Sequence, residues 1–297
     1  MQPRRNIIPN TQTTHKTQMT ERIFFYLSMV VIFCSSCATN KSQFGQSILE
    51  RPVDTTLTKQ AISKLRNIDN SIFDKATFIG KEQIEIKYRF FKPNQKSGEK
   101  YPLVVVYHGS GAIGTDNNSQ LGLLHKLFAS PDIQSKYPAF VLAPQFPTRS
   151  SDYTIDEDRK VLYSTSRPCL NEVFQLIDSL KASLDIDSKR IYVVGFSMGG
   201  STVINSLSAR PDLFAAGISV AGIPQFDQTQ VLKNIPIWLI HGIDDTENTI
   251  DSDEVLYKEI DDNIRFWKLK ATTHDNVFSS LILGETLPKW LFKYQKK

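Results

Sequence analysis

The sequence predicts an α/β fold in which a largely parallel, twisted sheet carries helices on both faces. Short apolar runs rich in β-branched and aromatic residues alternate along the chain with stretches whose apolar residues recur at helical spacing. Several of the short runs are continuously apolar, which is typical of strands buried on both faces. We therefore expect a single domain of this class to make up most of the chain.

Seven segments have the length and composition of strands. We expect strands over Ile84–Phe91, Leu103–Tyr107, Phe140–Leu142, Ile191–Val194, Ile218–Val220, Ile237–Ile240 and Ile264–Leu269. Helical spacing falls between them, first from Leu170 to Leu184 and then from Val203 to Leu207. One long polar segment, Gln145–Arg167, interrupts the alternation. A loop of that length inside a domain is either disordered or part of a site.

Composition and charge exclude several classes of protein. With 40% hydrophobic and 22% charged residues among 297, the chain can bury a large core and lacks the bias of a disordered or fibrous sequence. The net charge of +4 comes mostly from residues 1–37, because the rest holds 31 basic and 30 acidic residues. Nucleic-acid binding needs a concentrated basic face. We therefore expect no nucleic-acid partner.

The first 37 residues have the pattern of a signal peptide. Ile23–Phe33 is an uncharged run of 11 residues, which is too short to cross a bilayer but suits a signal-peptide hydrophobic region. Arg22 supplies the basic flank, and the small residues Ser35 and Ser36 lead into Cys37. The stretch resembles a bacterial lipoprotein signal, which implies that Cys37 becomes the lipidated first residue.

Cys34 stands where that lipoprotein pattern usually has Leu, so secretion without a lipid stays open, and Met19 is an alternative start. Lipidation would hold the protein at a membrane of the cell envelope, on its periplasmic or cell-surface face.

We expect residues 38–75 to form a polar tether with a short docking helix from Leu57 to Leu65, and residues 76–297 to form the α/β domain. Cys169 is expected to be a small apolar filler.

The strongest chemical signal is the Gly195-Phe-Ser197-Met-Gly199 motif, which follows a predicted strand and opens a predicted helix. A sharp strand-to-helix turn of this kind needs small residues on both sides of the serine, and it exposes the hydroxyl above the sheet. Ser197 is therefore the candidate nucleophile. The N–H of Met198, at the start of the helix, is the candidate donor to an oxyanion.

A serine nucleophile needs a general base oriented by an acid, which on this type of fold follow in the order Ser, Asp or Glu, His. Only His274 comes late enough in the chain. The other histidines, which precede the candidate acids, are His15, His108, His125 and His241. His241 is expected to be a packed residue that holds the loop carrying the acid.

The acid is expected just after the strand Ile237–Ile240. Asp245 is the first choice and Asp244 the alternative, whereas Glu247 and Asp251 are interpreted as solvated loop residues.

A second oxyanion donor is expected after the strand Leu103–Tyr107, where small residues follow. The N–H of Ser110 is the favoured donor and that of Gly111 is the alternative. Each such donor stabilises the transition state by about 3 to 4 kcal/mol.

These residues together resemble the α/β-hydrolase fold, and in particular a bacterial esterase and predicted-peptidase family related to prolyl oligopeptidases and to phospholipase/carboxylesterases. The segments that carry the resemblance are Tyr101–Gly111, Gly114–Asn117, Tyr137–Gln145, Asp187–Gly200, Ile235–Gly242 and Lys289–Phe292. The resemblance implies that the Asp four places after His241 is the catalytic acid, which is Asp245. It also implies that the His of the His274-Asp pair is the base.

The chain departs from this family at two places that often hold Trp, where it reads Phe146-Pro-Thr-Arg and Asn276-Val-Phe. Both stretches would line the substrate cleft. The family's specificity for the acid group of the ester is therefore not carried over to this chain.

The sequence predicts a serine esterase that cleaves carboxylic esters through an acyl-enzyme, with residues 76–297 as a single catalytic domain. Small-molecule or polysaccharide esters, including acetyl and feruloyl esters, are implied as substrates by resemblance only. No metal, organic cofactor or obligate protein partner is implied. A serine peptidase of prolyl-oligopeptidase type, and a non-catalytic surface-binding lipoprotein that merely retains the fold, stay open as alternatives.

Overall fold

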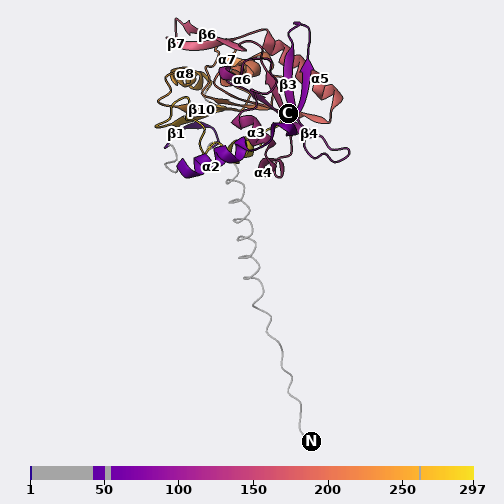
Figure 1. The fold of residues 1–297 in the computed structure, drawn as a ribbon. Helices are drawn as coiled ribbons and strands as arrows, with labels where there is room; N and C mark the ends of the chain where they lie inside the picture. Colours follow the sequence, from indigo (N-terminus) through magenta and orange to yellow (C-terminus); the bar gives the residue numbers. More distant parts are fainter. Residues whose placement is uncertain (2–42, 51–54, 261) are drawn as a thin grey trace. The chain divides into compact units, whose positions relative to one another are not determined.

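A central sheet organises the part of the chain that the computed structural model describes, which comprises Met1 and residues 43–50, 55–260 and 262–297 (Figure 1). Its strands are β1 (Gly45–Leu49), β2 (Asp74–Phe78), β3 (Ile86–Phe91), β4 (Tyr101–Tyr107), β5 (Phe140–Gln145), β8 (Ile186–Phe196), β9 (Ala216–Val220), β10 (Ile237–Gly242) and β11 (Ile264–Leu269). Their order across the sheet is β1-β11-β10-β9-β8-β4-β5-β3-β2. In this order, every neighbouring pair from β1 through β5 is parallel. At the other edge, β3 pairs antiparallel with β5, and β2 pairs antiparallel with β3. The predicted, mostly parallel sheet is confirmed.

Helices cover both faces of this sheet. They are α2 (Thr55–Arg66), α3 (Leu123–Ala129), α4 (Pro131–Gln134), α5 (Cys169–Ser183), α6 (Met198–Ala209), α7 (Thr229–Leu232), α8 (Asp251–Ile260) and α9 (Thr286–Leu291), with short 3₁₀ turns at η1 (Asn70–Ile72) and η2 (Ser110–Ala112). Figure 1 shows α6, α7 and α8 on one side of the sheet and α2, α3 and α4 on the other.

The alternation of side chains along β10 shows why both faces must be covered. Ile237 and Leu239 belong to the same buried cluster as apolar residues of α5, α6 and α8. Trp238, between them, points to the opposite face, as the two-residue period of a strand requires. There its ring packs against Trp290 of α9, with ring centroids 5.2 Å apart. A strand with apolar side chains on both sides is stable only between two layers.

The seven expected strands all lie in the sheet, with β11 matching its expected range and the others differing at their ends. The strands that were not expected, β1 and β2, lie at the two edges of the sheet and have mostly exposed side chains. They therefore lack the apolar pattern that marks a buried strand.

The compact unit that contains the sheet begins at Gly45 rather than at residue 76. The stretch expected to be a tether thus supplies β1, which pairs with β11, and β2, which pairs with β3. Helix α2 spans the expected docking helix. The carbonyl of Arg66, the last residue of α2, accepts a hydrogen bond of 3.1 Å from Lys126 of α3.

The polar segment expected as a loop contains a two-stranded antiparallel hairpin of β6 (Ser151–Asp156) and β7 (Val161–Ser166), which is separate from the main sheet. The hairpin packs on α6 through polar contacts. Asn205 donates to Ser151 Oγ at 2.9 Å, Ser164 Oγ donates to Asn205 Oδ1 at 3.0 Å, and the hydroxyls of Tyr153 and Ser201 lie 3.0 Å apart. Val161 and Tyr163 of β7 also pack against the hydrophobic core. Polar and apolar side chains are therefore mixed along the hairpin, and the sequence shows no apolar pattern typical of a strand.

The expected hydrophobic run Ile23–Phe33 and the candidate lipidated Cys37 lie outside the described residues. No helix among the described residues has the length and hydropathy needed to cross a bilayer. Cys169 is buried in the core cluster and forms no disulfide within the described residues, in keeping with its expected role as an apolar filler.

Candidate active site

Ser197 lies on a tight turn between β8 and α6. Its backbone has φ of 56° and ψ of −123°, a left-handed conformation that costs free energy for any residue other than glycine. A Cβ atom at Gly195 would lie 2.2 Å from the carbonyl oxygen of Gly199, and one at Gly199 would lie 2.3 Å from that of Tyr107. Both glycines of the motif are therefore required by backbone contacts, and the turn is pressed against the end of β4.

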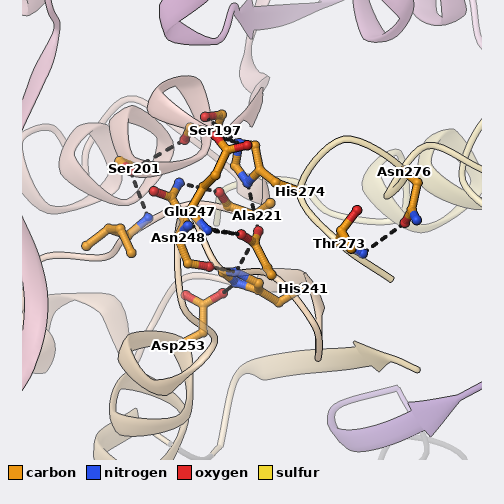
Figure 2. A network of polar contacts seen from close by, with 12 residues as sticks. Ser197, Ser201, Ala221, His241, Glu247, Asn248, Asp253, Thr273, His274 and Asn276 are labelled. Carbon is orange, nitrogen blue, oxygen red and sulfur yellow. Dashed lines mark hydrogen bonds and ion pairs between the residues drawn. The ribbon is translucent and has the colours of Figure 1, made fainter. Parts of the chain in front are cut away.

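The loops after β10 and β11 bring a histidine and a carboxylate to this serine. His274 Nε2 lies 2.8 Å from Ser197 Oγ, and His274 Nδ1 lies 2.7 Å from Asp245 Oδ2 (Figure 2). The His274 loop is held by a turn in which the N–H of Thr273 donates to Asn276 Oδ1 at 2.9 Å. On its other side, the ring of Phe196 lies 4.9 Å from the imidazole ring of His274.

The structure separates the two neighbouring candidates for the acid. Asp244 is exposed, whereas Asp245 is buried and makes the contact with His274. The second oxygen of Asp245 accepts hydrogen bonds from the N–H groups of Glu247 and Asn248, each at 3.0 Å. Burial would raise the pKa of Asp245, but hydrogen bonds from His241, His274 and Asn248 hold it at about 2. This carboxylate is therefore charged throughout the neutral range.

His241, expected to be a packed residue, is fully buried beneath Asp245. Its Nε2 lies 2.7 Å from the carbonyl oxygen of Asn248 and 3.4 Å from Asp245 Oδ2, while its Nδ1 lies 2.7 Å from Asp253 Oδ2 (Figure 2). Both ring nitrogens face acceptors, so both carry protons and the imidazole is charged. Burial opposes this charge, but the hydrogen bonds with Asp245 and Asp253 raise the pKa of His241 to about 10.

Asp253, in the first turn of α8, was missed by sequence reasoning. Its side chain is fully buried, and burial is the main cause that raises its pKa. An acidic residue in the first turn of a helix is usually an exposed partner of the helix dipole, so nothing in the local sequence marks it. The nearest signal is the buried His241, since a buried, charged imidazole needs a buried counter-charge.

The loop expected to supply the second oxyanion donor lies beside Ser197. A Cβ atom at Gly109 would lie 3.5 Å from Ser197 Cβ. Ser110 and Met198 are the first residues of η2 and α6, and N–H groups in a first helical turn have no acceptor within their own helix. His108 braces this loop, because its Nδ1 lies 2.8 Å from the carbonyl of Gly109 and its Nε2 accepts from the N–H of Phe146 at 2.9 Å. Burial lowers the pKa of His108 to about 4, so this brace stays uncharged.

A cavity of about 230 Å³ opens next to the turn that carries Ser197. Its walls come from the loop after β4, from Phe196 and Phe278, and from the start of α3. Among the described residues, no group of three His, Cys, Asp or Glu side chains could hold a metal ion.

The assembled groups can activate a hydroxyl. A base within hydrogen-bond distance of a serine, and an ionised carboxylate on the far nitrogen of that base, together raise the nucleophilicity of the serine. All the groups come from the carboxyl ends of β4, β8, β10 and β11. In open α/β sheets this edge is where ligands bind.

Comparison with known proteins agrees with this arrangement. A model of the prolyl oligopeptidase family matches residues 159–272, a range that includes Ser197 and Asp245 and ends just before His274. Over 73 residues the chain is 36% identical to a bifunctional acetylxylan esterase/xylanase from Neocallimastix patriciarum, an alignment that covers 25% of this chain and 11% of that enzyme.

Among solved structures, the chain is similar to a thermostable esterase, with a TM-score of 0.69 and 31% identity over 76% of this chain and 64% of that one. It is also similar to a ferulic acid esterase from Anaeromyces mucronatus, with a TM-score of 0.51 and 16% identity over 71% of this chain and 90% of that one. The chain spans less than two thirds of the thermostable esterase. The class defined by this fold and site is that of the α/β hydrolases.

The charged His241 predicts a specific pH dependence of stability. Its pKa rises from 6.5 in the unfolded chain to about 10 in the folded protein. Its contribution to stability is therefore complete below about pH 6.5 and is lost as the pH rises toward 10. The difference in free energy of unfolding between the wild type and His241→Gln, measured by urea titration, should be largest at low pH and shrink across this range.

Asp244→Asn is the matched control, because this exposed neighbour should show no such trend. A difference between wild type and His241→Gln that stays constant, or grows as the pH rises, would contradict a charged His241.

Proposed function

We propose that this protein is a serine hydrolase that cleaves carboxylic esters, with Ser197 as nucleophile, His274 as general base and Asp245 as the acid that orients it. The observation that carries the proposal is the continuous set of hydrogen bonds from Ser197 Oγ through His274 to the buried Asp245. The strained backbone of Ser197 supports it, since strain of this kind persists where the surrounding structure enforces it, and often at active sites.

In this mechanism His274 Nε2 removes the hydroxyl proton as Ser197 Oγ attacks the ester carbonyl carbon. Asp245 stabilises the imidazolium that forms, without taking its proton. The N–H groups of Met198 and Ser110, with Gly111 as the alternative to Ser110, stabilise the negative charge that develops on the carbonyl oxygen. His274 then protonates the leaving alcohol, and a water molecule activated by His274 releases the acid and restores Ser197.

Two similarities support ester rather than amide bonds as substrates. The thermostable esterase shares 31% identity with this chain, and the Neocallimastix enzyme, named as an acetylxylan esterase, shares 36% over its shorter alignment. A peptidase is the second candidate, because the matching family model is that of the prolyl oligopeptidases. Acetyl or feruloyl esters of polysaccharides are the proposed natural substrates, by likeness to the names of these relatives.

We further propose that residues 1–37 are a signal peptide of lipoprotein type and that Cys37 becomes lipidated. The support is the sequence pattern alone: a basic flank, an apolar run of 11 residues and small residues before Cys37. The enzyme would then be held at a membrane in the cell envelope, and it would be secreted if it were not lipidated.

Replacing the nucleophile gives the first test. The wild type should react with a fluorophosphonate probe and hydrolyse p-nitrophenyl acetate. Ser197→Ala should abolish labelling and reduce kcat by about 10⁴-fold or more, because the attacking group is lost. Ser188→Ala, at an exposed position on the same strand, is the control and should behave as the wild type.

Labelling that survives Ser197→Ala, or no labelling of the folded wild type, would refute the enzyme and favour a non-catalytic binding protein. Hydrolysis of aminoacyl p-nitroanilides without hydrolysis of any ester would favour the peptidase.

Replacing the candidate lipidated residue gives the second test. In bacterial cells that process lipoproteins, Cys37→Ala should move the full-length protein from the membrane fraction to the soluble or secreted fraction and remove the lipid mass. Cys34→Ala is the matched control and should leave both unchanged. A Cys37→Ala protein that stays in membranes with its lipid mass would place the anchor elsewhere.

A further inference from the structure

A groove of about 540 Å³ with a basic lining lies far from the catalytic residues. A single carboxylate, that of Glu99, lines it together with five cationic side chains, which are Lys100, Lys136, Arg190, Lys289 and Lys293. Acidic and basic residues are almost equal in number over residues 38–297. The groove therefore concentrates positive charge that the composition of the chain does not reveal.

The sheet topology places this groove at the amino ends of the central strands. Lys100 precedes β4, Lys136 precedes β5, and Arg190 lies in the first half of β8. These three strands pair in parallel, so the residues at their amino ends meet at one edge of the sheet. Ser197 follows the other end of β8, about 20 Å further along the strand. The groove and the catalytic residues thus occupy opposite edges of the sheet.

Some of the charged groups in the groove are paired within the domain. Lys136 forms an ion pair with Glu285, and Arg190 forms one with Asp187 at 2.6 Å. The lining carboxylate lies 3.9 Å from Lys96, which compensates its charge. These pairs leave the positive charge of the other three lysines to act on an outside partner.

Those three lysines come from two parts of the chain. They are exposed and form no ion pair with any described residue, and they are Lys100, Lys289 and Lys293. None of the five cationic side chains in the groove is buried, whereas a pocket built for one small anion would enclose at least one of its donors. A dispersed set of exposed cations acts through its summed field, and a bilayer surface with many anionic headgroups fits such a field.

Aromatic rings between the lysines agree with a membrane as the partner. Tyr137 and Phe292 line the groove, are half-buried, and have ring centroids 5.3 Å apart. Aromatic side chains are favoured at the level of lipid headgroups, where one end of the ring is apolar and the other is wet.

The path of the chain supplies an independent argument. Because β1 runs parallel to β11, its first residue, Gly45, lies at the same edge of the sheet as the groove. If Cys37 carries the lipid, eight residues lead from the anchor to Gly45, and a chain of that length spans at most about 29 Å. An anchor attached so close to this edge keeps it near the bilayer surface.

We propose that the amino edge of the sheet docks on an anionic phospholipid surface through Lys100, Lys289 and Lys293, with Ser197 facing away from the membrane. The orientation rests on the proposed lipid anchor, whereas the attraction to anionic lipid rests on the groove alone. Salt screens exposed charges, so at physiological ionic strength the attraction orients an anchored domain but does not retain an unanchored one. The active site then faces esters that lie outside the bilayer.

The first test measures vesicle binding of the unlipidated chain from Ala38 onward, which contains the whole compact unit that begins at Gly45. Vesicles of phosphatidylcholine with about 30% phosphatidylglycerol should sediment the chain at about 20 mM salt and release it at about 500 mM, because the Debye length falls from about 20 Å to about 4 Å. Phosphatidylcholine alone should not bind it. Equal binding to both vesicles, or binding that salt does not weaken, would overturn the proposal.

Two double variants locate the contact. Lys100→Gln/Lys293→Gln should weaken binding to the anionic vesicles by about fivefold or more, because two charges are lost from the docking face. Lys81→Gln/Lys270→Gln is the matched control: it removes the same charge from exposed lysines that follow β2 and β11, at the opposite edge. It should keep binding within about twofold. An equal loss in both variants would show that net charge alone matters, which would refute the docking face.

Both double variants should react with the fluorophosphonate probe and hydrolyse p-nitrophenyl acetate as the unsubstituted chain does, since no changed lysine contacts the catalytic groups. Vesicle binding does not depend on ester hydrolysis, so a failure of the proposed enzyme and a failure of the docking face are seen separately. Retention of the chain on a soluble acidic polymer such as polygalacturonate, without binding to anionic vesicles, would assign the groove to a polymer and overturn the proposal.

The second test measures orientation in the processed, lipidated protein. A fluorescent donor is attached through Ser135→Cys, just before β5, or through Thr246→Cys, in the loop after β10, and both positions are exposed. Energy transfer to a labelled headgroup in anionic vesicles should be stronger from position 135, and the difference should shrink in Lys100→Gln/Lys293→Gln. Equal transfer from the two positions, stronger transfer from position 246, or a protein without lipid would overturn the orientation.

Discussion

The close approach of two backbones at the Ser197 turn is the constraint on which the rest of the site depends. Gly199 sits where any side chain would collide with the carbonyl of Tyr107, and Gly195 sits where one would collide with Gly199. The contact forces Ser197 into a left-handed conformation and presses the start of α6 against the end of β4. It thereby fixes three things together: the direction of the hydroxyl, the N–H of Met198, and the distance from the serine to the loop of Ser110.

The parallel order of the sheet supplies the other groups. Because β4, β8, β10 and β11 run in the same direction, their exit loops meet at one edge and bring residues far apart in the chain into contact. The polar groups then form a continuous series from the half-buried Ser197 through the buried His274 and Asp245 to the fully buried His241 and Asp253. A charged imidazole between two carboxylates lowers the cost of burying either one. Asp245 is therefore held by charge as well as by backbone N–H groups.

Most of this arrangement could be predicted from the sequence, and the reasons for the exceptions are physical. Ser197 and His274 were identifiable because the turn motif and the chain order restrict them. The choice between Asp244 and Asp245 rests on which of two adjacent side chains is buried, which the structure shows directly. Asp253 was not predictable, because nothing in the local sequence shows that this carboxylate in a first helical turn is buried against His241. The edge strands β1 and β2 were missed because most of their side chains are exposed. The hairpin of β6 and β7 was missed because its few apolar residues, such as Val161 and Tyr163, stand among polar ones.

The most direct test of the account is to trap the acyl-enzyme. The wild type would be mixed with p-nitrophenyl acetate, quenched in acid within its first turnovers, digested and mapped by mass spectrometry. The account predicts an acetyl group on the peptide containing Ser197, at a stoichiometry that approaches one per chain and matches any burst of p-nitrophenol. Steady turnover with no acetyl group on Ser197, or with the acetyl group on another residue whose replacement abolishes activity, would contradict it.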